Sequence, residues 1–581
     1  MYNGFSGGLL DYSIKIGGEA GQGIQTIGDT LSKVFSRSGY HVFTHQDYMS
    51  RVRGGHNFYQ IRLSDRPILA SRDVIDILVA LDRESITLHE KELSDTGIII
   101  YDSFTLKEVY EKPQFLNVPF AELAMKNGGD RIMANTVATG AVLGMLGLNL
   151  ETFFGILKDT LQQKGEDVFQ ANERAAIAGR KFALQRCTQC SFSLAPFSAP
   201  KMLIGVNEAI GLGAIGSGCQ FYTAYPMTPS TGIMLYIASK AKEYGVIVEQ
   251  AEDEIAAINM AIGASFAGVR SMTGSSGGGF ALMVEGLSLA AMTETPIVIA
   301  LAQRPAPATG LPTRTEQADL LFALHAAHGE FPRVIFAPGT PEQAFGLTNK
   351  AFDLSQKYQI PVIILTDQYL ADAQWTVEHI DLKRFVYHDY RLRRDELEIL
   401  SEYRRHAITE NGVSPFGIPG DSHHVIVTDS DEHDEEGHII EDSASRIRMV
   451  DKRLFRKLPL IAREITPPVL YGSNKPDIVI VGWGSTYGVM REAVDTLSKS
   501  NSIAMMHFSE VYPLPPVDKF DYLQVLRNAK KTICVENNAT GQFARLMRAE
   551  TGYGFDVEIH KYDGRPFTLE TFIGELDAYI G

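Results

Sequence analysis

The stretch from Tyr225 to Thr231, Tyr-Pro-Met-Thr-Pro-Ser-Thr, concentrates side chains that can bind a ligand. Four of its seven residues carry a hydroxyl group, and two are prolines, which fix φ and remove backbone donors. This composition excludes an ordinary helix or a central strand. We expect a rigid loop at the carboxyl end of the apolar segment 220–224, because open α/β sheets bind ligands at that edge.

Glu254 is a second candidate for chemistry. The neighbouring acids Glu249, Glu252 and Asp253 are explained by the helix dipole, which they stabilise at a helix N-terminus. Glu254 differs because it directly precedes Ile-Ala-Ala-Ile-Asn-Met-Ala-Ile-Gly-Ala, which predicts a buried helix over residues 254–266. A carboxylate in such a helix needs a partner, and a ring nitrogen of a ligand is one candidate.

Two further segments are suited to contact a ligand. Ser271–Gly279 reads Ser-Met-Thr-Gly-Ser-Ser-Gly-Gly-Gly and predicts a loop that a ligand can approach closely, with a flexible connector as the alternative. Arg304 follows the apolar segment 297–301, and Arg314 lies shortly after it in Pro-Thr-Arg-Thr-Glu-Gln. An arginine at the end of a strand can bind a carboxylate through two parallel hydrogen bonds, although surface ion pairs also explain both residues.

Near the N-terminus, the glycine-rich segment Gly17–Gly23 separates a predicted strand, 12–16, from a predicted helix, 24–38. Backbone N–H groups in this context can bind a phosphate or a carboxylate. The spacing is G-x-x-G-x-G and not the dinucleotide pattern G-x-G-x-x-G, and tight strand–helix packing explains the glycines equally well. The following segment Arg51–Asn57 is either a solvated turn or a contact with a phosphorylated ligand or a partner chain.

Short apolar segments alternate with helical patterns along most of the 581 residues, which predicts a multidomain α/β fold with parallel sheets. We expect domains at 1–190, 200–381 and 459–581, with residues 382–458 as an extended connector. The connector has an acidic run at 429–436 and histidines at 423, 424, 433 and 438. Their spacing is irregular, so we predict a solvated connector and no metal site.

Composition narrows the class of protein. A net charge of −16 argues against nucleic acid as a partner. The four cysteines are too few for a disulfide framework, which favours a reducing, cytoplasmic location. Cys187 and Cys190 are interpreted as two free thiols in a surface linker, since one such pair is only half of a four-sulfur metal site. No apolar run is long enough to span a bilayer, so we expect no membrane association.

Taken together, these motifs resemble the 2-oxoacid:ferredoxin oxidoreductases. The matching segments are 225–231, Glu254 with its helix, 273–279, and 303–305 through 313–315. The N-terminal part, with Gly17–Gly23 and Arg53–Asn57, resembles the gamma domain of that family. The chain is therefore similar to a fused gamma–alpha subunit, as in two-subunit enzymes that act on 2-oxoglutarate.

The resemblance implies a thiamine diphosphate pyrimidine-binding domain at 200–381 and a transketolase C-terminal-like domain at 459–581. It also implies roles for single residues. Glu254 would face the aminopyrimidine ring as a catalytic residue, and Thr228 and Arg304 would hold the carboxylate of the 2-oxoacid. The other implied contacts are Tyr225 and Arg314 with the substrate, Arg314 at its distal carboxylate, and Pro226, Gly277 and Gly278 with the cofactor.

Two expected motifs are missing from the chain: a Gly-Asp-Gly…Asn site for diphosphate and magnesium, and cysteines spaced for a [4Fe–4S] cluster. The resemblance places both on a beta subunit, in a dimer of alpha–beta heterodimers. The implied reaction converts 2-oxoglutarate and CoA to succinyl-CoA and CO2 with reduction of ferredoxin, or runs in reverse as in a reductive tricarboxylic acid cycle. The alternatives are the same chemistry on pyruvate or a branched 2-oxoacid, a non-catalytic assembly subunit, and a nucleotide-dependent dehydrogenase.

Overall fold

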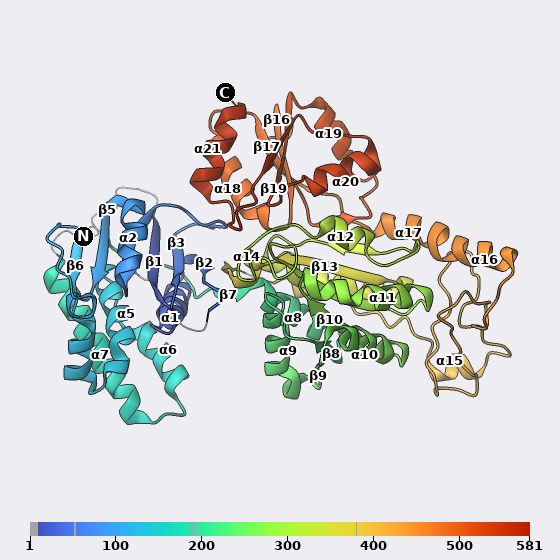
Figure 1. Cartoon of the computed structure of the whole chain (residues 1–581), viewed down its shortest axis with the longest axis horizontal. Coiled ribbons are helices and arrows are strands. Elements are labelled where there is room, and N and C mark those ends of the chain that lie inside the picture. Colours follow the sequence, from blue (N-terminus) through green and yellow to red (C-terminus); the bar gives the residue numbers. More distant parts are fainter. Residues whose placement is uncertain are drawn as a thin grey trace.

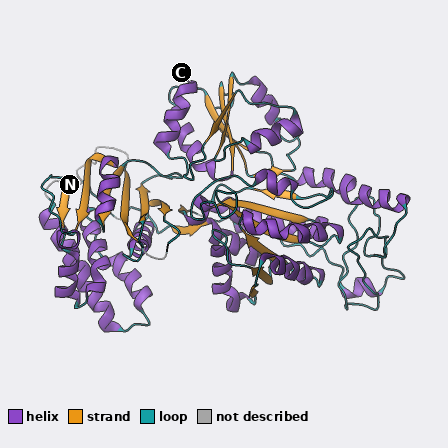
Figure 2. Ribbon diagram, viewed as in Figure 1, coloured by secondary structure: helices purple, strands orange, loops and turns teal. Residues whose placement is uncertain are grey.

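The computed structural model describes residues 10–51, 54–187, 190, 192–195, 197–378 and 380–580. Within these ranges the chain forms sheets of eight, seven and five strands, each flanked by helices (Figures 1 and 2). The predicted multidomain α/β class is confirmed. The first sheet lies at one end of the molecule in Figure 1, and the C-terminal sheet sits above the second.

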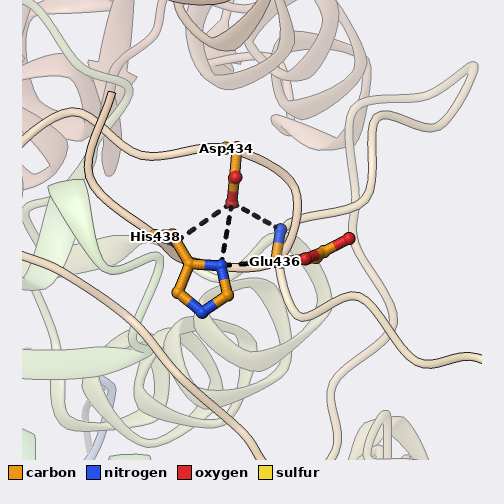
Figure 3. Close-up of side chains that lie close together, drawn as sticks. All are labelled: Asp434, Glu436 and His438. Atoms are coloured by element: carbon orange, nitrogen blue, oxygen red, sulfur yellow. Dashed lines mark hydrogen bonds and ion pairs between the residues drawn. The ribbon is translucent and has the colours of Figure 1, made fainter. Parts of the chain in front are cut away.

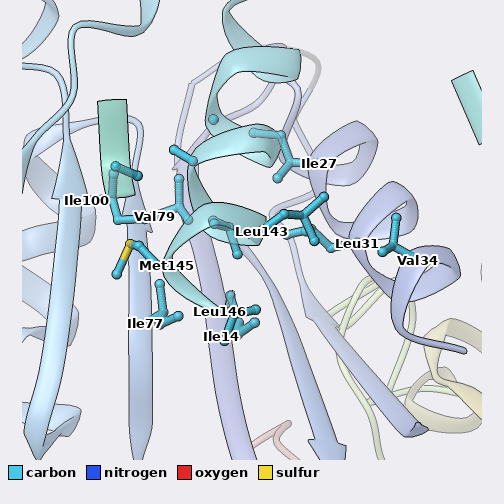
Figure 4. Close-up of a cluster of buried hydrophobic side chains, with 14 of the residues drawn as sticks. Ile14, Ile27, Leu31, Val34, Ile77, Val79, Ile100, Leu143, Met145 and Leu146 are labelled. Atoms are coloured by element: carbon cyan, nitrogen blue, oxygen red, sulfur yellow. The ribbon is translucent and has the colours of Figure 1, made fainter. Parts of the chain in front are cut away.

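The first region carries its helices mainly on one face of the sheet (Figure 1). Its elements are β1 (Asp11–Glu19), α1 (Ile24–Arg37), β2 (His41–Asp47), β3 (His56–Ser64), β4 (Ile75–Ala80), α2 (Arg83–His89), β5 (Leu93–Tyr101), α3 (Ser103–Leu106), β6 (Phe115–Asn117), α4 (Phe120–Leu123), α5 (Ala134–Met145), α6 (Glu151–Leu161) and α7 (Glu166–Arg186). Ile14 and Ile77 from the sheet meet Leu143 of α5 and Leu31 of α1 in a continuous apolar core (Figure 4).

The first sheet is mixed, which corrects the prediction of a parallel sheet. β1 is parallel to β4 on one side and antiparallel to β3 on the other, and β3 is antiparallel to β2. β3 is not predicted from the sequence, because it contains several polar residues that become buried only in the fold. Arg62, only 3% exposed, pairs with Asp11 and with Glu492 of the C-terminal region, each at 2.7 Å. His56 and Asn57 belong to this strand and not to a loop.

The N-terminal glycines divide into two groups. β1 continues through Glu19, so Gly17 and Gly18 lie in a strand, where close packing requires them. A Cβ on Gly17 would lie 2.6 Å from Ser85 Oγ. Gly21 has a φ of 95°, and a Cβ on this residue would meet no atom within 4 Å, so this glycine faces open space at the turn before α1.

The second sheet has the strand order β18-β12-β13-β11-β10-β8-β9, in which β18 (Glu510–Tyr512) comes from the C-terminal region. The sheet is parallel apart from the pairing of β12 with β18. The elements of this region are β7 (Met202–Gly205), α8 (Val206–Gly216), β8 (Phe221–Ala224), α9 (Thr231–Tyr244), β9 (Ile247–Gln250), α10 (Glu254–Phe266), β10 (Ser271–Ser275), α11 (Gly277–Met292), β11 (Ile297–Gln303), α12 (Leu320–His325), β12 (Val334–Phe336), α13 (Pro341–Tyr358), β13 (Pro361–Asp367), α14 (Gln368–Asp372) and β14 (Gln374–Val377).

Two features of this region differ from expectation. Ser271–Gly279 is not a loop, because residues 271–275 form the buried strand β10 and α11 begins at Gly277. The serines, threonine and glycine of β10 are atypical of a central strand, yet this strand is buried between β8 and β11. In addition, β7 and β14 extend the first sheet, with Trp375 of β14 paired to Phe43 of β2. The first two regions therefore share one sheet.

The C-terminal sheet has the order β15-β17-β16-β19-β20. The elements of the connector and the C-terminal region are α15 (Arg394–Glu398), α16 (Ser443–Val450), α17 (Lys457–Glu464), β15 (Val469–Gly472), β16 (Ile478–Trp483), α18 (Tyr487–Leu497), β17 (Ile503–Phe508), β18 (Glu510–Tyr512), α19 (Tyr522–Asn528), β19 (Lys531–Glu536), α20 (Gln542–Thr551), β20 (Val557–His560) and α21 (Leu569–Ile580). The connector projects to one side of the second sheet with long loops around α15 and α16 (Figure 1).

The connector is not uniformly solvated. His433 is fully buried, which corrects the prediction for this histidine. Asp434, Glu436 and His438 do lie at the surface and close together (Figure 3). Their proximity has a local cause, since Asp434 Oδ1 accepts hydrogen bonds from the backbone N–H groups of Glu436 at 2.9 Å and His438 at 3.0 Å.

The cysteine pair also differs from expectation. Cys187 and Cys190 are joined by a disulfide, so the prediction of two free thiols is wrong. The pair follows the end of α7, where the backbone N–H of Cys187 donates to the carbonyl of Ala183 at 2.8 Å. Cys219 and Cys534 are free and buried.

Candidate active site

The candidate residues gather at one edge of the second sheet. β10 lies between β8 and β11 and is parallel to both, so the three strands end at the same edge. The Tyr225 loop follows β8, Ser276 follows β10, and Arg304 follows β11. The prediction that the Tyr225 loop lies at the carboxyl end of a strand is confirmed.

The Tyr225 loop is held by one of its own hydroxyl groups, that of Ser230, and by α8. Ser230 Oγ donates to the carbonyl of Met227 at 2.8 Å, and Asn207 Nδ2 of α8 donates to the carbonyl of Pro229 at 3.0 Å. Tyr225 is 40% exposed, whereas Pro226 and Thr228 are half-buried. The loop thus presents an aromatic ring and a hydroxyl group from a fixed backbone.

Arg304 meets this loop directly. Its Nη1 donates to the backbone carbonyl of Thr228 at 2.8 Å, which brings together the two residues predicted to bind a carboxylate. Burial lowers the pKa of Arg304, and the nearby charge of Asp319 raises it. The guanidinium stays charged and keeps donors beyond Nη1, because arginine carries five N–H groups.

Glu254 is the first residue of α10, as predicted, and is 2% exposed. Asp253 caps the helix by accepting from the backbone N–H of Ala256 at 2.7 Å, which leaves Glu254 free of a capping role. Within the described ranges, one hydrogen bond reaches the Glu254 carboxylate, from Ser275 Oγ at 3.0 Å. A buried carboxylate with a single neutral donor retains capacity for another partner.

The three glycines that begin α11 have different surroundings. A Cβ on Gly279 would lie 2.2 Å from Glu254 Oε1, so Gly279 makes room for that carboxylate. A Cβ on Gly277 would lie 2.5 Å from Asp319 Oδ2. A Cβ on Gly278 would meet no atom within 4 Å, so Gly278 faces open space. Of the two glycines predicted to contact a cofactor, Gly278 is thus open and Gly277 is already covered.

Sequence reasoning missed two carboxylates beside this site. Burial raises the pKa of Asp319 to about 6, although the charge of Arg304 lowers it. Burial and the charge of Asp319 raise the pKa of Glu316 to about 7. Both residues follow Arg314 closely in the sequence, but only the fold brings Asp319 against Gly277.

Arg314 lies at a junction of three regions. Its Nη1 pairs with Asp47 Oδ1 of β2 at 2.7 Å and donates to the carbonyl of Tyr48 at 2.8 Å. The other oxygen of Asp47 pairs with Arg565 Nε of the C-terminal region at 2.9 Å. One aspartate therefore holds two arginines, and these three side chains together carry one net positive charge.

The segment that contains Arg314 is fixed by the C-terminal region. Gln317 is fully buried, its backbone N–H donates to the carbonyl of Asn537 at 2.7 Å, and its Oε1 accepts from the N–H of Asn537 at 2.9 Å. Gln317 Nε2 also donates to the carbonyl of Trp483 at 2.8 Å. These bonds hold the whole 311–319 segment in place beside Arg304.

A cleft of about 1160 Å³ separates the first region from the second. Gly21 and Gly23 of the N-terminal turn line one wall together with Arg51, whereas Val52 and Arg53 lie outside the described residues. Asn207 and Tyr236 line the opposite wall. Asn207 Oδ1 is buried without a hydrogen-bond partner among the described residues, and Arg51 supplies the cleft with a cation.

Two protein families match the chain. Residues 212–452 match "Pyruvate flavodoxin/ferredoxin oxidoreductase, thiamine diP-bdg", and residues 13–182 match "Pyruvate ferredoxin/flavodoxin oxidoreductase". The first match contains the strand edge with Glu254 and Arg304, and the second contains the N-terminal glycine turn. Fold and site thus define an oxidoreductase with a thiamine diphosphate-binding domain.

Relatives that match nearly the whole chain identify the class of oxidoreductase more closely. The 2-oxoacid:ferredoxin oxidoreductase subunit alpha of a Sulfolobus species is 31% identical, over 95% of this chain and 94% of that protein. The 2-oxoglutarate oxidoreductase subunit KorA of Mycobacterium tuberculosis is 27% identical, over 97% and 90%. A structure of 2-oxoglutarate:ferredoxin oxidoreductase from Magnetococcus marinus, with 2-oxoglutarate, coenzyme A and succinyl-CoA bound, has a TM-score of 0.90 at 31% identity and covers 98% of this chain and 100% of its own.

The chain belongs to the 2-oxoacid:ferredoxin oxidoreductase family, as an alpha subunit. Among the helices of the described ranges, none is both long and apolar enough to cross a membrane.

Proposed function

We propose that this alpha subunit takes part in the CoA-dependent oxidative decarboxylation of 2-oxoglutarate to succinyl-CoA, with ferredoxin as the electron acceptor. One observation carries the proposal: Arg304 contacts Thr228 at the same strand edge that presents the buried carboxylate of Glu254. A cation beside a buried carboxylate suits a carboxylate substrate that reacts next to a heteroaromatic cofactor. The reaction can also run in reverse as a reductive carboxylation.

The residues present fit thiamine diphosphate. Glu254 has spare hydrogen-bonding capacity, Gly279 leaves room for its carboxylate, and Gly278 faces open space. Bound thiamine diphosphate supplies the nucleophilic carbon and the electron sink that decarboxylation of a 2-oxoacid requires. Glu254 would share a proton with a ring nitrogen of the pyrimidine, with Pro226 and Gly278 beside the cofactor.

Arg304 and Thr228 would hold the carboxylate that departs as CO2. The guanidinium is fixed through Nη1, so its remaining N–H groups are oriented before a substrate arrives. Such preorganisation lowers the entropic cost of binding in a reactive geometry. Tyr225 would border the substrate from the solvent side, since its ring is partly exposed.

Arg314 supports 2-oxoglutarate as the substrate, because a second carboxylate needs a cation. Asp47 neutralises only one of the two arginines that it contacts, Arg314 and Arg565. The junction thus retains attraction for an anion, and the Magnetococcus marinus relative has 2-oxoglutarate bound. Pyruvate and branched 2-oxoacids lack a second carboxylate and are the alternative substrates.

The cleft between the first two regions would receive part of CoA. It combines the glycine turn before α1 with the cations Lys33 and Arg51, and such a turn can bind phosphate through backbone N–H groups. The same Magnetococcus marinus structure has coenzyme A bound.

A beta subunit would complete the enzyme. A [4Fe–4S] cluster needs four cysteine ligands, but Cys187 and Cys190 are paired and Cys219 and Cys534 are buried singly. We therefore assign the cluster, the magnesium ion and most of the diphosphate site to the partner, in a cytoplasmic dimer of alpha–beta heterodimers that passes electrons to ferredoxin.

Co-expression with the beta subunit tests this proposal. We expect the purified complex to contain iron and thiamine and to turn over 2-oxoglutarate faster than pyruvate or a branched 2-oxoacid. Faster turnover of pyruvate would overturn the substrate assignment. A complex without any 2-oxoacid turnover would favour an assembly subunit, and NAD(P) binding in a titration would favour the dehydrogenase.

Arg314 is tested by Arg314→Met, with Arg527→Met in α19 as a matched control remote from Asp47. The Arg314 change should raise KM for 2-oxoglutarate about tenfold or more and leave KM for pyruvate nearly unchanged, because only the former has a distal carboxylate. Equal effects on both substrates would show that Arg314 has a structural role alone.

A further inference from the structure

Two carboxylates flank the first turn of α11. Glu254 lies against Gly279, and Asp319 lies against Gly277, with separations of 2.2 and 2.5 Å between a carboxylate oxygen and the position that a Cβ would occupy. Glu254 has an assigned role in the proposed function, whereas Asp319 has none. A side chain at position 277 would displace Asp319, so the absence of a side chain there preserves this arrangement.

Asp319 is held in place by its backbone. Its N–H donates to Gln303 Oε1 at 2.9 Å, and its carbonyl accepts from the N–H of Ala323 at 2.8 Å. The residue is only 7% exposed. Among the described residues, none donates a hydrogen bond to its carboxylate, and the side chain does not cap α12. The carboxylate is therefore not committed to a structural hydrogen bond within the described residues.

The charged neighbours of Asp319 belong to the candidate site. Arg304 follows β11 and interacts electrostatically with Asp319, Glu316 lies on the same segment, and Glu254 lies across the first turn of α11. From α20, Gln542 contacts the start of α12 with an uncharged amide. Arg304 is thus the cation that balances Asp319, and it is also the cation proposed to bind the substrate carboxylate.

We propose that Asp319 is a positioning residue that controls the charge of the 2-oxoacid site. In the free enzyme the ionised carboxylate balances Arg304, and Asp319 takes up a proton when the substrate carboxylate binds to that arginine. This inference depends on the proposed role of Arg304. Two anions beside one guanidinium repel each other, so protonation of Asp319 removes the repulsion.

Protonation of Asp319 on binding fixes the direction in which substrate affinity changes with pH. Burial already raises the pKa of Asp319 to about 6, and a bound carboxylate raises it further. Substrate therefore binds most tightly below pH 6 and more weakly as the pH rises toward 8. If binding raises the pKa by about one unit, affinity changes about tenfold across this range, and about half a proton is taken up at pH 6.5.

Calorimetry tests the proposal without turnover. The alpha–beta complex is loaded with 3-deazathiamine diphosphate, which cannot react, and titrated with 2-oxoglutarate at pH 6.5 in two buffers of different ionisation enthalpy. We expect uptake of about half a proton in the wild type. Asp319→Asn should reduce uptake markedly and tighten binding at pH 8, while Asp518→Asn, the same change at an exposed position, should alter neither.

The outcomes separate this inference from the proposed function. Arg304→Gln should abolish binding, and retained binding would overturn the assigned carboxylate site itself. Normal binding without proton uptake in the wild type would overturn the role of Asp319 alone, even if the Asp319→Asn complex did not assemble. Unchanged uptake in Asp319→Asn would also overturn it. A purely structural role would change stability but not proton uptake.

Discussion

Two glutamates of the second region, Glu254 and Glu294, are buried to a similar extent but have different partners. They are 2% and 1% exposed. Glu294 pairs with Lys452 at 2.6 Å and with Lys457, and its Oε1 lies 3.3 Å from His406 Nδ1. From the part of the chain that the structure describes, Glu254 receives one hydrogen bond, from the hydroxyl group of Ser275.

The partners of each glutamate determine whether its carboxylate can take part in chemistry. Burial alone would raise the pKa of Glu294, but Lys452 and Lys457 hold it well below its usual range, so this carboxylate is a fixed anion. It attaches the connector to the second sheet, because both lysines come from the end of the connector. Glu254, by contrast, has capacity for one more partner, and a cofactor can supply it.

The sharpest test of this contrast is Glu254→Gln. The change keeps size and burial but removes the carboxylate that would share a proton with the cofactor. We expect turnover of the alpha–beta complex to fall about 10²–10⁴-fold, with thermal stability unchanged. The control is Glu249→Gln on the neighbouring strand β9, an exposed position. Near-normal activity in the Glu254 variant would remove the distinction between the two glutamates.

The converse test is Glu294→Gln, which leaves Lys452 and Lys457 buried without a counter-charge. We expect the free energy of unfolding to fall by about 3–5 kcal/mol. Glu464→Gln disrupts the partly exposed pair with Lys357 and should cost about 1 kcal/mol or less. Urea denaturation followed by circular dichroism measures both. Equal, small losses would contradict a structural role for the Glu294 cluster.

Two glycines of α11, Gly278 and Gly279, differ in whether an added side chain would meet Glu254. Gly279→Ala places a methyl group against the Glu254 carboxylate and should destabilise the protein by about 1–3 kcal/mol while reducing thiamine content. Gly278→Ala meets no protein atom and should stabilise the helix by up to about 1 kcal/mol. Thermal denaturation of both variants measures these two changes in stability. Identical shifts would show that the Glu254 contact does not constrain this turn.

The smallest expected effect is on the folding stability of the protein in acid. The folded-state pKa of Glu294 lies below its unfolded value, so its contribution to stability is present above about pH 4.3 and is lost as the pH falls through the lower folded value. Each pH unit in this window costs the wild type up to about 1.4 kcal/mol from this group. Glu294→Gln should show a shallower loss of apparent Tm between pH 4.5 and 3. Parallel curves would argue that other carboxylates dominate.

Local patterns predicted a substantial part of this molecule. The Tyr225 loop, the start of α10 at Glu254 and the position of Arg304 after β11 all follow from residues close together in the chain. Prolines restrict the backbone, apolar periodicity marks helices, and a polar residue after an apolar strand marks the binding edge. These signals act over a few residues, so a sequence contains them in full.

Other features depended on contacts between distant residues. β3 and β10 lack long apolar runs, since polar or small residues interrupt them, and the burial of those residues depends on elements elsewhere in the chain. The contact of Asp319 with Gly277 and the pair between Asp47 and Arg314 join residues far apart in the sequence. No local pattern encodes such a distance.

Local patterns in the chain therefore identify the candidate residues and the edge of the sheet where they gather. The balance of each charge, in contrast, depends on the fold. It left Glu254 with one neutral donor, surrounded Glu294 with lysines and placed Asp319 near Arg304. This dependence arises because the state of a buried carboxylate is set by its desolvation and by the nearest charges, and both come from chain segments that meet only after folding.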